Sequence, residues 1–292
     1  MPTNTNSRRT SIKDGKSPAH CWPDETVRGQ GELSPENRKH LLAARAAAGK
    51  PRFAVISDIH GNVEALKSVL HFLDHQGVTG VLCLGDIVGY GPSPSECIAL
   101  LREREIPCLR GNHDELVLAN APLGDMHPDA AVGIRYARRC LSRSDQHFLA
   151  SLPSAFVFSK FAFVHASFPD PTAFDYVFTS DDAEPHLASQ PAPVSFFGHT
   201  HRQGGFYFCL GGASDLSLKS PVPLDFAERM SFNPGAVGQP RDRDPRAAFL
   251  ICNAKLGVIE FQRVTYDVDC TAAAIDAVGL PRRLATRLRL GR

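Results

Sequence analysis

The sequence lacks the features that mark several large classes of protein. Its eight cysteines include no C-x-x-C pair, which excludes zinc ribbons and thioredoxin-like redox motifs, and we expect reduced cysteines that mostly lie in the core. No stretch is long and apolar enough to predict a membrane span. The formal net charge is only +1 with histidines neutral, so there is no basic footprint for nucleic acid. We therefore expect a cytoplasmic protein that attracts anionic ligands only locally.

Apolar residues are frequent enough for a core but unevenly spread. They make up 43% of the 292 residues. Residues 1–33 are rich in Ser, Thr, Asn, Gly, Pro and charge, which predicts a disordered tail. Ser34 followed by Pro35 is typical of a helix start, so residues 34–50 should form a helix or linker that either packs on the rest or stays separate. Residues 51–292 should form the main domain.

The main domain begins with alternating strand and helix patterns. Apolar strands are predicted at residues 53–56, 81–84 and 108–109, separated by helical patterns, which favours a parallel sheet covered by helices. Ligands of such sheets bind at the carboxyl ends of the strands. Residues 115–152 have a helical pattern. Paired strand-like segments between residues 156 and 261 then predict a second, more antiparallel sheet, and a basic helix is expected at residues 282–290.

Polar segments with metal-binding side chains follow five of the apolar strands. They are Ser57–Asn62, Gly85–Val88, Gly111–Asp114, Val164–Ser167 and Gly198–His201. Asp58 and His60 are two residues apart, as are His199 and His201, so each pair faces one way on an extended segment. Oxygen and nitrogen ligands of this kind suit Mn, Fe, Zn, Co or Ni better than Mg or Ca. Glycines 61, 85, 111 and 198 should let the backbone turn beside the metals.

In order and kind, these segments resemble the motifs of the calcineurin-like metallophosphoesterases. The segments Gly85–Pro92 and Asn233–Asp242, and the ending from Gly279 to Arg292, further resemble a bacterial and archaeal branch of small phosphodiesterases. The resemblance covers residues 52–292 and leaves out the first fifty. It implies an α/β fold, a four-layer sandwich in which two facing mixed β-sheets are flanked by helices.

The resemblance also implies a role for each motif residue. One divalent transition-metal ion would be held by Asp58, His60, Asp86 and His201, and a second by Asp86, Asn112, His165 and His199. His113 would face the substrate and either donate a proton to the leaving oxygen or stabilise its charge, and Asp114 would orient His113. A hydroxide bridging the two metals would then hydrolyse a phosphomonoester or phosphodiester.

Other functions are weighed against this one. A dinucleoside polyphosphate hydrolase is the nearest alternative. A protein serine/threonine phosphatase is disfavoured, because Gly89-Tyr90-Gly91 stands where such enzymes carry Asp-Arg-Gly. A non-catalytic metal-binding scaffold would require the loss of a ligand or of His113. Arg110 would either reach a phosphate or form a surface ion pair, and Tyr90 is a candidate for stacking on a nucleobase. The expected partner is a small phosphoester or nucleotide-like substrate, and the sequence is silent on oligomeric state.

Overall fold

The structure is a computed structural model that describes residues 35–292 except 120, 125, 210 and 217–218. The predicted tail and Ser34 lie outside the described residues. The helices are α1 (Pro35–Ala48), α2 (Val63–Asp74), α3 (Pro94–Glu103), α4 (Asn112–Leu118), α5 (Pro128–Cys140), α6 (Arg143–Ala150), α7 (Ser180–Ser189), α8 (Val268–Ala277) and α9 (Arg282–Leu290). In the part of the chain so described, no helix is both long and apolar enough to cross a membrane.

The strands form two mixed sheets. The first has the order β2-β1-β10-β11-β8, made from β2 (Gly80–Cys83), β1 (Arg52–Ile56), β10 (Ala247–Asn253), β11 (Val258–Val264) and β8 (Val222–Pro223). The second has the order β3-β4-β5-β9-β6-β7, made from β3 (Ala155–Phe158), β4 (Phe161–Val164), β5 (Val194–Phe196), β9 (Met230–Pro234), β6 (Gln203–Cys209) and β7 (Gly212–Asp215). β1 and β2 are parallel, as are β4, β5 and β9, and the remaining pairs are antiparallel.

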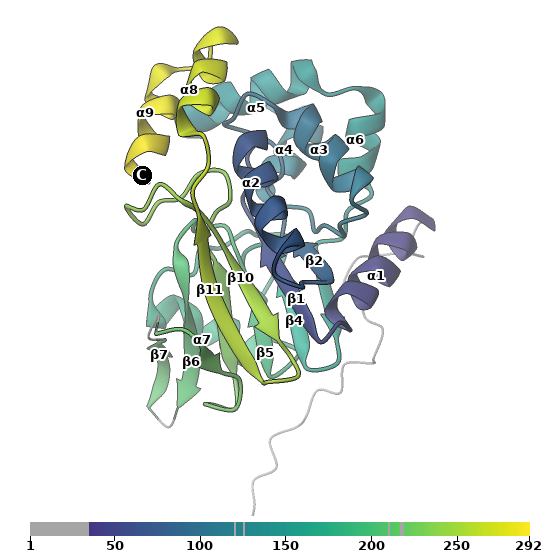
Figure 1. Ribbon diagram of the computed structural model, residues 1–292, viewed down its shortest axis with the longest axis vertical. Coiled ribbons are helices and arrows are strands. Elements are labelled where there is room, and N and C mark those ends of the chain that lie inside the picture. Colours follow the sequence, from purple (N-terminus) through teal and green to yellow (C-terminus); the bar gives the residue numbers. More distant parts are fainter. Residues whose placement is uncertain (1–34, 120, 125, 210, 217–218) are drawn as a thin grey trace, which may run out of the picture.

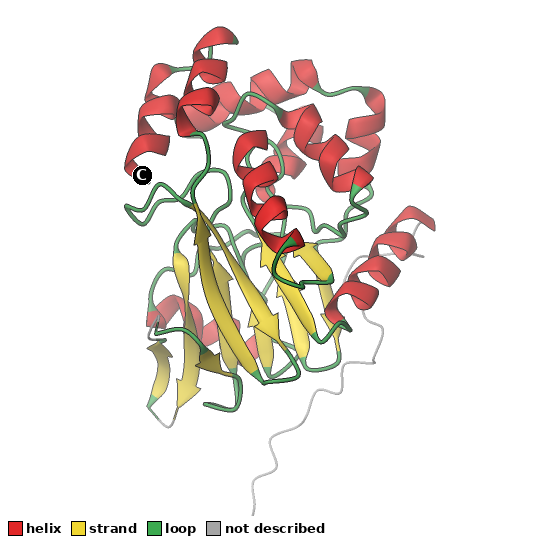
Figure 2. Cartoon of the chain, viewed as in Figure 1, coloured by secondary structure: helices red, strands yellow, loops and turns green. Residues whose placement is uncertain are grey.

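The alternation of side chains along β1 explains how the layers stack. Phe53 and Val55 belong to the core between the two sheets, whereas Ala54 and Ile56 belong to the core under the helices. On the far side of the second sheet, α7 packs over a third cluster of apolar residues. The molecule is therefore helices, sheet, sheet and helix in sequence, which confirms the predicted four-layer sandwich (Figure 2).

The helices at the two ends of the chain occupy separate places. α1 packs on β2 and β3, with Ala44 and Ala47 in the core between the sheets, so it does not stay separate from the domain. α8 and α9 pack against each other at the opposite side of the molecule (Figure 1). Their apolar residues share a cluster with Tyr90 and with Ala130 of α5. The C-terminal pair thus covers the loop that follows β2.

Two expectations about local structure are wrong. β10 pairs with β1 and β11 pairs with β10, so both strands belong to the first sheet, which is mixed and not parallel. Residues 108–109 form only an isolated bridge between Cys108 and Cys83. In both cases the apolar pattern was recognised and the long-range partner decided the outcome, which a sequence pattern does not specify. The described cysteines are free and four of the seven are buried, whereas Cys140, Cys209 and Cys270 are exposed.

Candidate functional site

The five polar segments meet at one edge of the two sheets. Asp58 and His60 follow β1, Asp86 follows β2, His165 follows β4, and His199 and His201 follow β5. Asn112 is the first residue of α4, after the bridge at Cys108. β1 and β2 are parallel, and so are β4 and β5, which brings the carboxyl ends of each pair to the same edge.

The backbone of this edge is strained at the candidate ligands. Asp58, His60, Asp86, His199 and His201 all have positive φ angles, between 48° and 65°. Non-glycine residues seldom adopt this left-handed conformation, which costs of the order of 1–2 kcal/mol each. Backbone hydrogen bonds hold it in place, for example from the His60 N–H to the Asp86 carbonyl (2.9 Å). The fold therefore stabilises these side-chain directions against local preference.

Two of the four glycines have another purpose than the one expected. Gly61 and Gly85 do have positive φ, as a sharp turn requires. Gly111 and Gly198 do not, but a β-carbon at Gly111 would overlap Asp86, and one at Gly198 would overlap Ser57. These two glycines are needed because their own backbone lies directly against the side chains of Asp86, Ser57 and Asp58, which leaves no room for a β-carbon.

The candidate ligands form two groups that share one carboxylate. Ligand atoms of Asp58, His60, Asp86 and His201 lie within 4.8 Å of one another, as do those of Asp86, His165 and His199. All six side chains are buried. Asn112 joins the second group, because its Oδ1 lies 3.2 Å from Nε2 of His165. The structure thus brings together all seven residues expected as ligands, with Asp86 between the two groups.

Hydrogen bonds fix which nitrogen of three histidines faces the site. Nδ1 lies 3.1 Å from the Val88 carbonyl in His60, 3.1 Å from the Leu84 carbonyl in His165, and 2.6 Å from the Gln239 carbonyl in His201. A carbonyl only accepts, so each Nδ1 carries a hydrogen and each Nε2 faces the site, where it is bare whenever its ring is neutral. This is the arrangement that a metal ligand requires.

In the group of Asp58, His60, Asp86 and His201, the lone pairs of two histidine nitrogens point toward each other. Nε2 of His60 and Nε2 of His201 are 3.0 Å apart. Burial lowers the pKa of both imidazoles, so both rings are neutral at neutral pH and neither has a hydrogen to offer the other. Two bare nitrogens at this distance repel each other unless a cation lies beside both.

Two carboxylate oxygens in the same part of the site lack hydrogen-bond partners among the described residues. Asp58 Oδ1 and Asp86 Oδ2 make no hydrogen bond in the described protein. Asp58 Oδ1 lies 3.2 Å from His201 Nε2, and Asp86 Oδ2 lies 3.5 Å from Nε2 of both His60 and His165. An uncompensated buried charge costs several kcal/mol. The donor set, its bare nitrogens and its unpartnered oxygens fit two divalent metal ions.

The negative charge of the two aspartates also changes the pKa of His165. Burial disfavours its protonated form, but the carboxylates of Asp86 and Asp58 outweigh burial and raise the pKa of His165 to about 9. The two acids therefore require a cation, and without a metal that cation is a proton on His165. Metal binding would displace this proton.

His113 is adjacent to the ligands without belonging to them. Its ring centroid lies 4.8 Å from that of His60 and 4.7 Å from that of Tyr90. It is 5% exposed, and its Nδ1 has no hydrogen-bond partner among the described residues. Burial lowers the pKa of His113 to about 4. A neutral imidazole with a free nitrogen is thus held beside the candidate metal centre.

Asp114 does not contact the His113 imidazole, contrary to expectation. Its Oδ1 accepts from the backbone N–H groups of Ile87 and Val88 (2.9 and 3.2 Å), and its Oδ2 accepts from the N–H of Gly111 (3.0 Å). The carboxylate is fully engaged in tying the start of α4 to the loop after β2. Asp114 therefore positions His113 through the backbone.

The two expected substrate-binding side chains are engaged within the protein. Nε of Arg110 lies 3.5 Å from the Glu115 carboxylate, so the ion-pair alternative describes this residue. Tyr90 is only 8% exposed. Its ring lies against His60 and His113, and it leaves no open face on which a nucleobase could stack.

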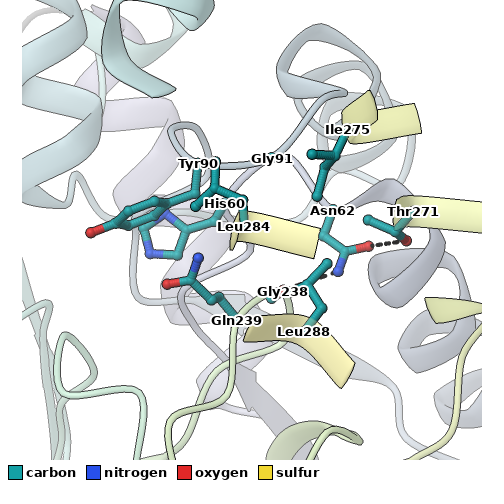
Figure 3. Close-up of a pocket in the computed structure, with 10 residues that line it drawn as sticks. All are labelled: His60, Asn62, Tyr90, Gly91, Gly238, Gln239, Thr271, Ile275, Leu284 and Leu288. Atoms are coloured by element: carbon teal, nitrogen blue, oxygen red, sulfur yellow. Dashed lines mark hydrogen bonds between the residues drawn. The ribbon is translucent and has the colours of Figure 1, made fainter. Parts of the chain in front are cut away.

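Sequence reasoning missed several side chains at the site. The guanidiniums of Arg241 and Arg287 lie over the Tyr90 ring, 5.5 and 6.0 Å from its centroid. Gln239 joins His60 and Tyr90 in lining a narrow cavity that α8 and α9 close from the other side (Figure 3). Tyr176, which is 47% exposed, stacks on His199 with centroids 3.9 Å apart. Gln239, Arg241 and Arg287 stood in segments used for the resemblance without being singled out, whereas no sequence signal distinguished Tyr176.

Comparisons with known proteins agree with this arrangement. Residues 52–255 match the calcineurin-like phosphoesterase superfamily domain. The chain is 35% identical over 250 residues to the uncharacterized protein MJ0912 of Methanocaldococcus jannaschii, covering 83% of this chain and 99% of that one. It is 33% identical to a metallophosphoesterase from Sphaerobacter thermophilus, with a TM-score of 0.73 over 82% of this chain and 99% of that one.

A more distant solved structure shares the fold. It is the hypothetical protein PH1004 from Pyrococcus horikoshii, 20% identical, with a TM-score of 0.69 over 82% of this chain and 98% of that one. The family match spans every strand of the two sheets except β11, and every candidate ligand. The chain therefore belongs to the calcineurin-like phosphoesterase superfamily and is a metallophosphoesterase.

Proposed function

We propose that the protein hydrolyses a phosphomonoester or phosphodiester with two divalent transition-metal ions, drawn from Mn, Fe, Zn, Co and Ni. One ion would be held by Asp58, His60, Asp86 and His201, and the other by Asp86, Asn112, His165 and His199. The observation that carries this proposal is the sharing of Asp86 by two buried ligand groups. Asp58 Oδ1 and Asp86 Oδ2 have no hydrogen-bond partner among the described residues, and Nε2 of His60 faces Nε2 of His201.

The chemistry divides between the ions and the protein. When bound, two such ions supply an activated water and Lewis-acid stabilisation of the phosphoryl charge. His113 would donate to the oxygen of the leaving group, because its ring stands beside the ligands, 4.8 Å from the ring of His60. Asp114 would keep His113 and Asn112 in place by tying α4 to the loop after β2.

The test is reconstitution of the metal-free protein. Chelator-treated protein is loaded with each of the five metals in turn, its metal content is measured by elemental analysis, and its rate is measured on p-nitrophenyl phosphate and bis-p-nitrophenyl phosphate. We expect two ions per chain in the active protein and activity that rises with occupancy. Full activity with one ion per chain, or with none, would contradict the proposal.

A further inference from the structure

Eight arginines of the described residues lie within 4.0 Å of a carboxylate. Arg263 pairs with Asp242, Arg246 with Asp244, Arg289 with Asp269 and Arg283 with Asp129. Arg241 and Arg287 belong to the remaining arginines, because neither guanidinium has a side-chain carboxylate within 4.0 Å among the described residues. Two positive charges are thus left without acidic side-chain partners.

These two arginines reach the same ring from distant parts of the chain. Arg241 belongs to the loop after β9, and its main-chain N–H donates to the carbonyl of His201 (3.0 Å). Arg287 belongs to α9. Both guanidiniums lie over Tyr90, whose ring centroid is 4.9 Å from that of His60 and 4.7 Å from that of His113. The pair therefore stands one aromatic ring away from the candidate metal centre.

Hydrogen bonds hold the guanidiniums of Arg241 and Arg287 along one edge each. Nε and a terminal nitrogen of Arg241 donate to Oε1 of Gln239 (3.3 and 2.9 Å), and Gln239 is itself 2% exposed. Nε of Arg287 donates to the main-chain oxygen of Arg292 (2.8 Å). Their other N–H groups have no acceptor in the described protein. A guanidinium fixed at one edge, with its remaining donors free, is preorganised to bind an anion.

The helix that carries Arg287 is held firmly against the site. Leu284 and Leu288 of α9 line the cavity beside His60 and Tyr90 (Figure 3). Arg283, one turn before Arg287, is paired with Asp129, which is 2% exposed on its side chain. Burial lowers the pKa of Arg287, and the nearby charge of Arg241 lowers it further. The fold thus maintains two like charges close together, an arrangement that an anionic ligand would relieve.

The geometry points to a subsite formed by Arg241 and Arg287 that binds a second anionic group of the substrate, of the phosphoryl class. This inference rests on the proposed function, because it assigns the metal centre to the phosphoryl group that is cleaved. The two metal ions already offset the charge of that group, whereas the guanidiniums offer two further charges and several donors beside it. The preferred substrate would then carry two phosphoryl groups.

The test measures binding without turnover. Affinities of the metal-loaded protein for adenosine 5′-monophosphate, adenosine 5′-diphosphate and adenosine 3′,5′-bisphosphate are determined by calorimetry, and metal content is measured after each titration to exclude chelation. We expect at least one of the doubly phosphorylated ligands to bind about tenfold more tightly than the monophosphate. The two doubly phosphorylated ligands also show where the second group lies.

Variants then assign the difference to the two arginines. Arg241→Gln combined with Arg287→Gln should remove the preference and leave the affinity for the monophosphate within about threefold. The matched control is Arg289→Gln, on the same helix but paired with Asp269, which should keep the preference. Equal affinities in the unaltered protein, or a preference that survives the double substitution, would overturn the subsite. Ligand binding without hydrolysis would instead refute the proposed function alone.

Discussion

The buried histidine of α7, His186, contrasts with the buried histidines of the candidate metal centre. His186 of α7 lies behind the second sheet, where its Nε2 is 3.2 Å from the Ser195 hydroxyl and 2.9 Å from the Ser231 hydroxyl. It has no acid beside it, and burial alone lowers its pKa to about 3. The histidines of the candidate metal centre are as deeply buried, yet their Nε2 atoms face other bare nitrogens and unpartnered carboxylates.

The difference shows what separates a structural histidine from a ligand. The serines around His186 lie within β5 and β9, where ordinary strand geometry provides hydroxyl partners. The candidate ligands lie just beyond strand ends, and five of them have left-handed backbone angles that oppose local preference. Burial alone therefore does not distinguish a structural histidine from a metal ligand. Strain combined with unsatisfied acceptors indicates a cation site.

The largest effect should come from the shared carboxylate. Asp86→Asn replaces the ligand common to both groups, so we expect both ions to be lost and turnover to be nearly abolished. Elemental analysis and rates on bis-p-nitrophenyl phosphate measure this. His186→Leu serves as the matched buried control and should keep both ions and most activity. Retention of two ions in Asp86→Asn would show that Asp86 does not connect the groups.

Most of the candidate site could be predicted because its residues follow apolar strands in short polar segments. A motif of this kind is local, and the fold only has to bring the strand ends together, as it does for Asp86 and His165. Roles that depend on a partner far away in the chain could not be predicted. Asp114 reaches backbone groups of the loop after β2, and Arg287 reaches the Tyr90 ring, because of packing that no local pattern encodes.

The same limit applies to the fold. The apolar segments of β10 and β11 were recognised as strands, since alternation is a local property. The place of β10 beside β1 follows from registers such as Ala54 opposite Ile251, which joins segments from opposite ends of the domain, and β11 then pairs with β10. The pattern of β9 is harder to recognise, because Met230–Pro234 contains Asn233 and Pro234, residues that favour turns.

A smaller but still large effect is expected at His113. His113→Ala should lower kcat by roughly 10²–10⁴-fold, the usual contribution of a proton donor, while both ions remain bound. The loss should be smaller for p-nitrophenyl esters than for alkyl esters, because p-nitrophenolate leaves with little protonation. The measurement is kcat on a series of leaving groups. Equal losses across the series would indicate positioning instead, and a lost ion would make His113 a ligand.

The third prediction concerns the charge of Asp58. Burial alone would raise the pKa of Asp58, but His201 and His165 outweigh burial and hold this pKa below its usual range, so the folded chain stabilises the carboxylate. In the metal-free protein at neutral pH, Asp58→Asn should therefore lower the free energy of unfolding. Denaturant unfolding in chelator measures this loss.

Metal should widen this difference in stability. The unaltered protein should gain more from added metal than Asp58→Asn, because ligand binding stabilises only the chain that binds it tightly. Equal stability of the two metal-free proteins would show that the histidines do not stabilise the Asp58 carboxylate in the folded chain.

The smallest effect should be the dependence of stability on pH at His186. Its pKa is about 3 in the folded protein, against about 6.5 when exposed, so folding favours the neutral ring. The stabilisation is complete above pH 6.5 and is lost as pH falls toward 3, by at most about 1.4 kcal/mol for each pH unit. His186→Leu removes this titration. We expect the difference in unfolding free energy between the two proteins, measured in urea with chelator present, to be constant above pH 7 and to shift in favour of the variant between pH 6 and 4. A difference that stays constant over the whole range would show that His186 remains neutral in the unfolded chain or accepts a proton without cost in the folded one.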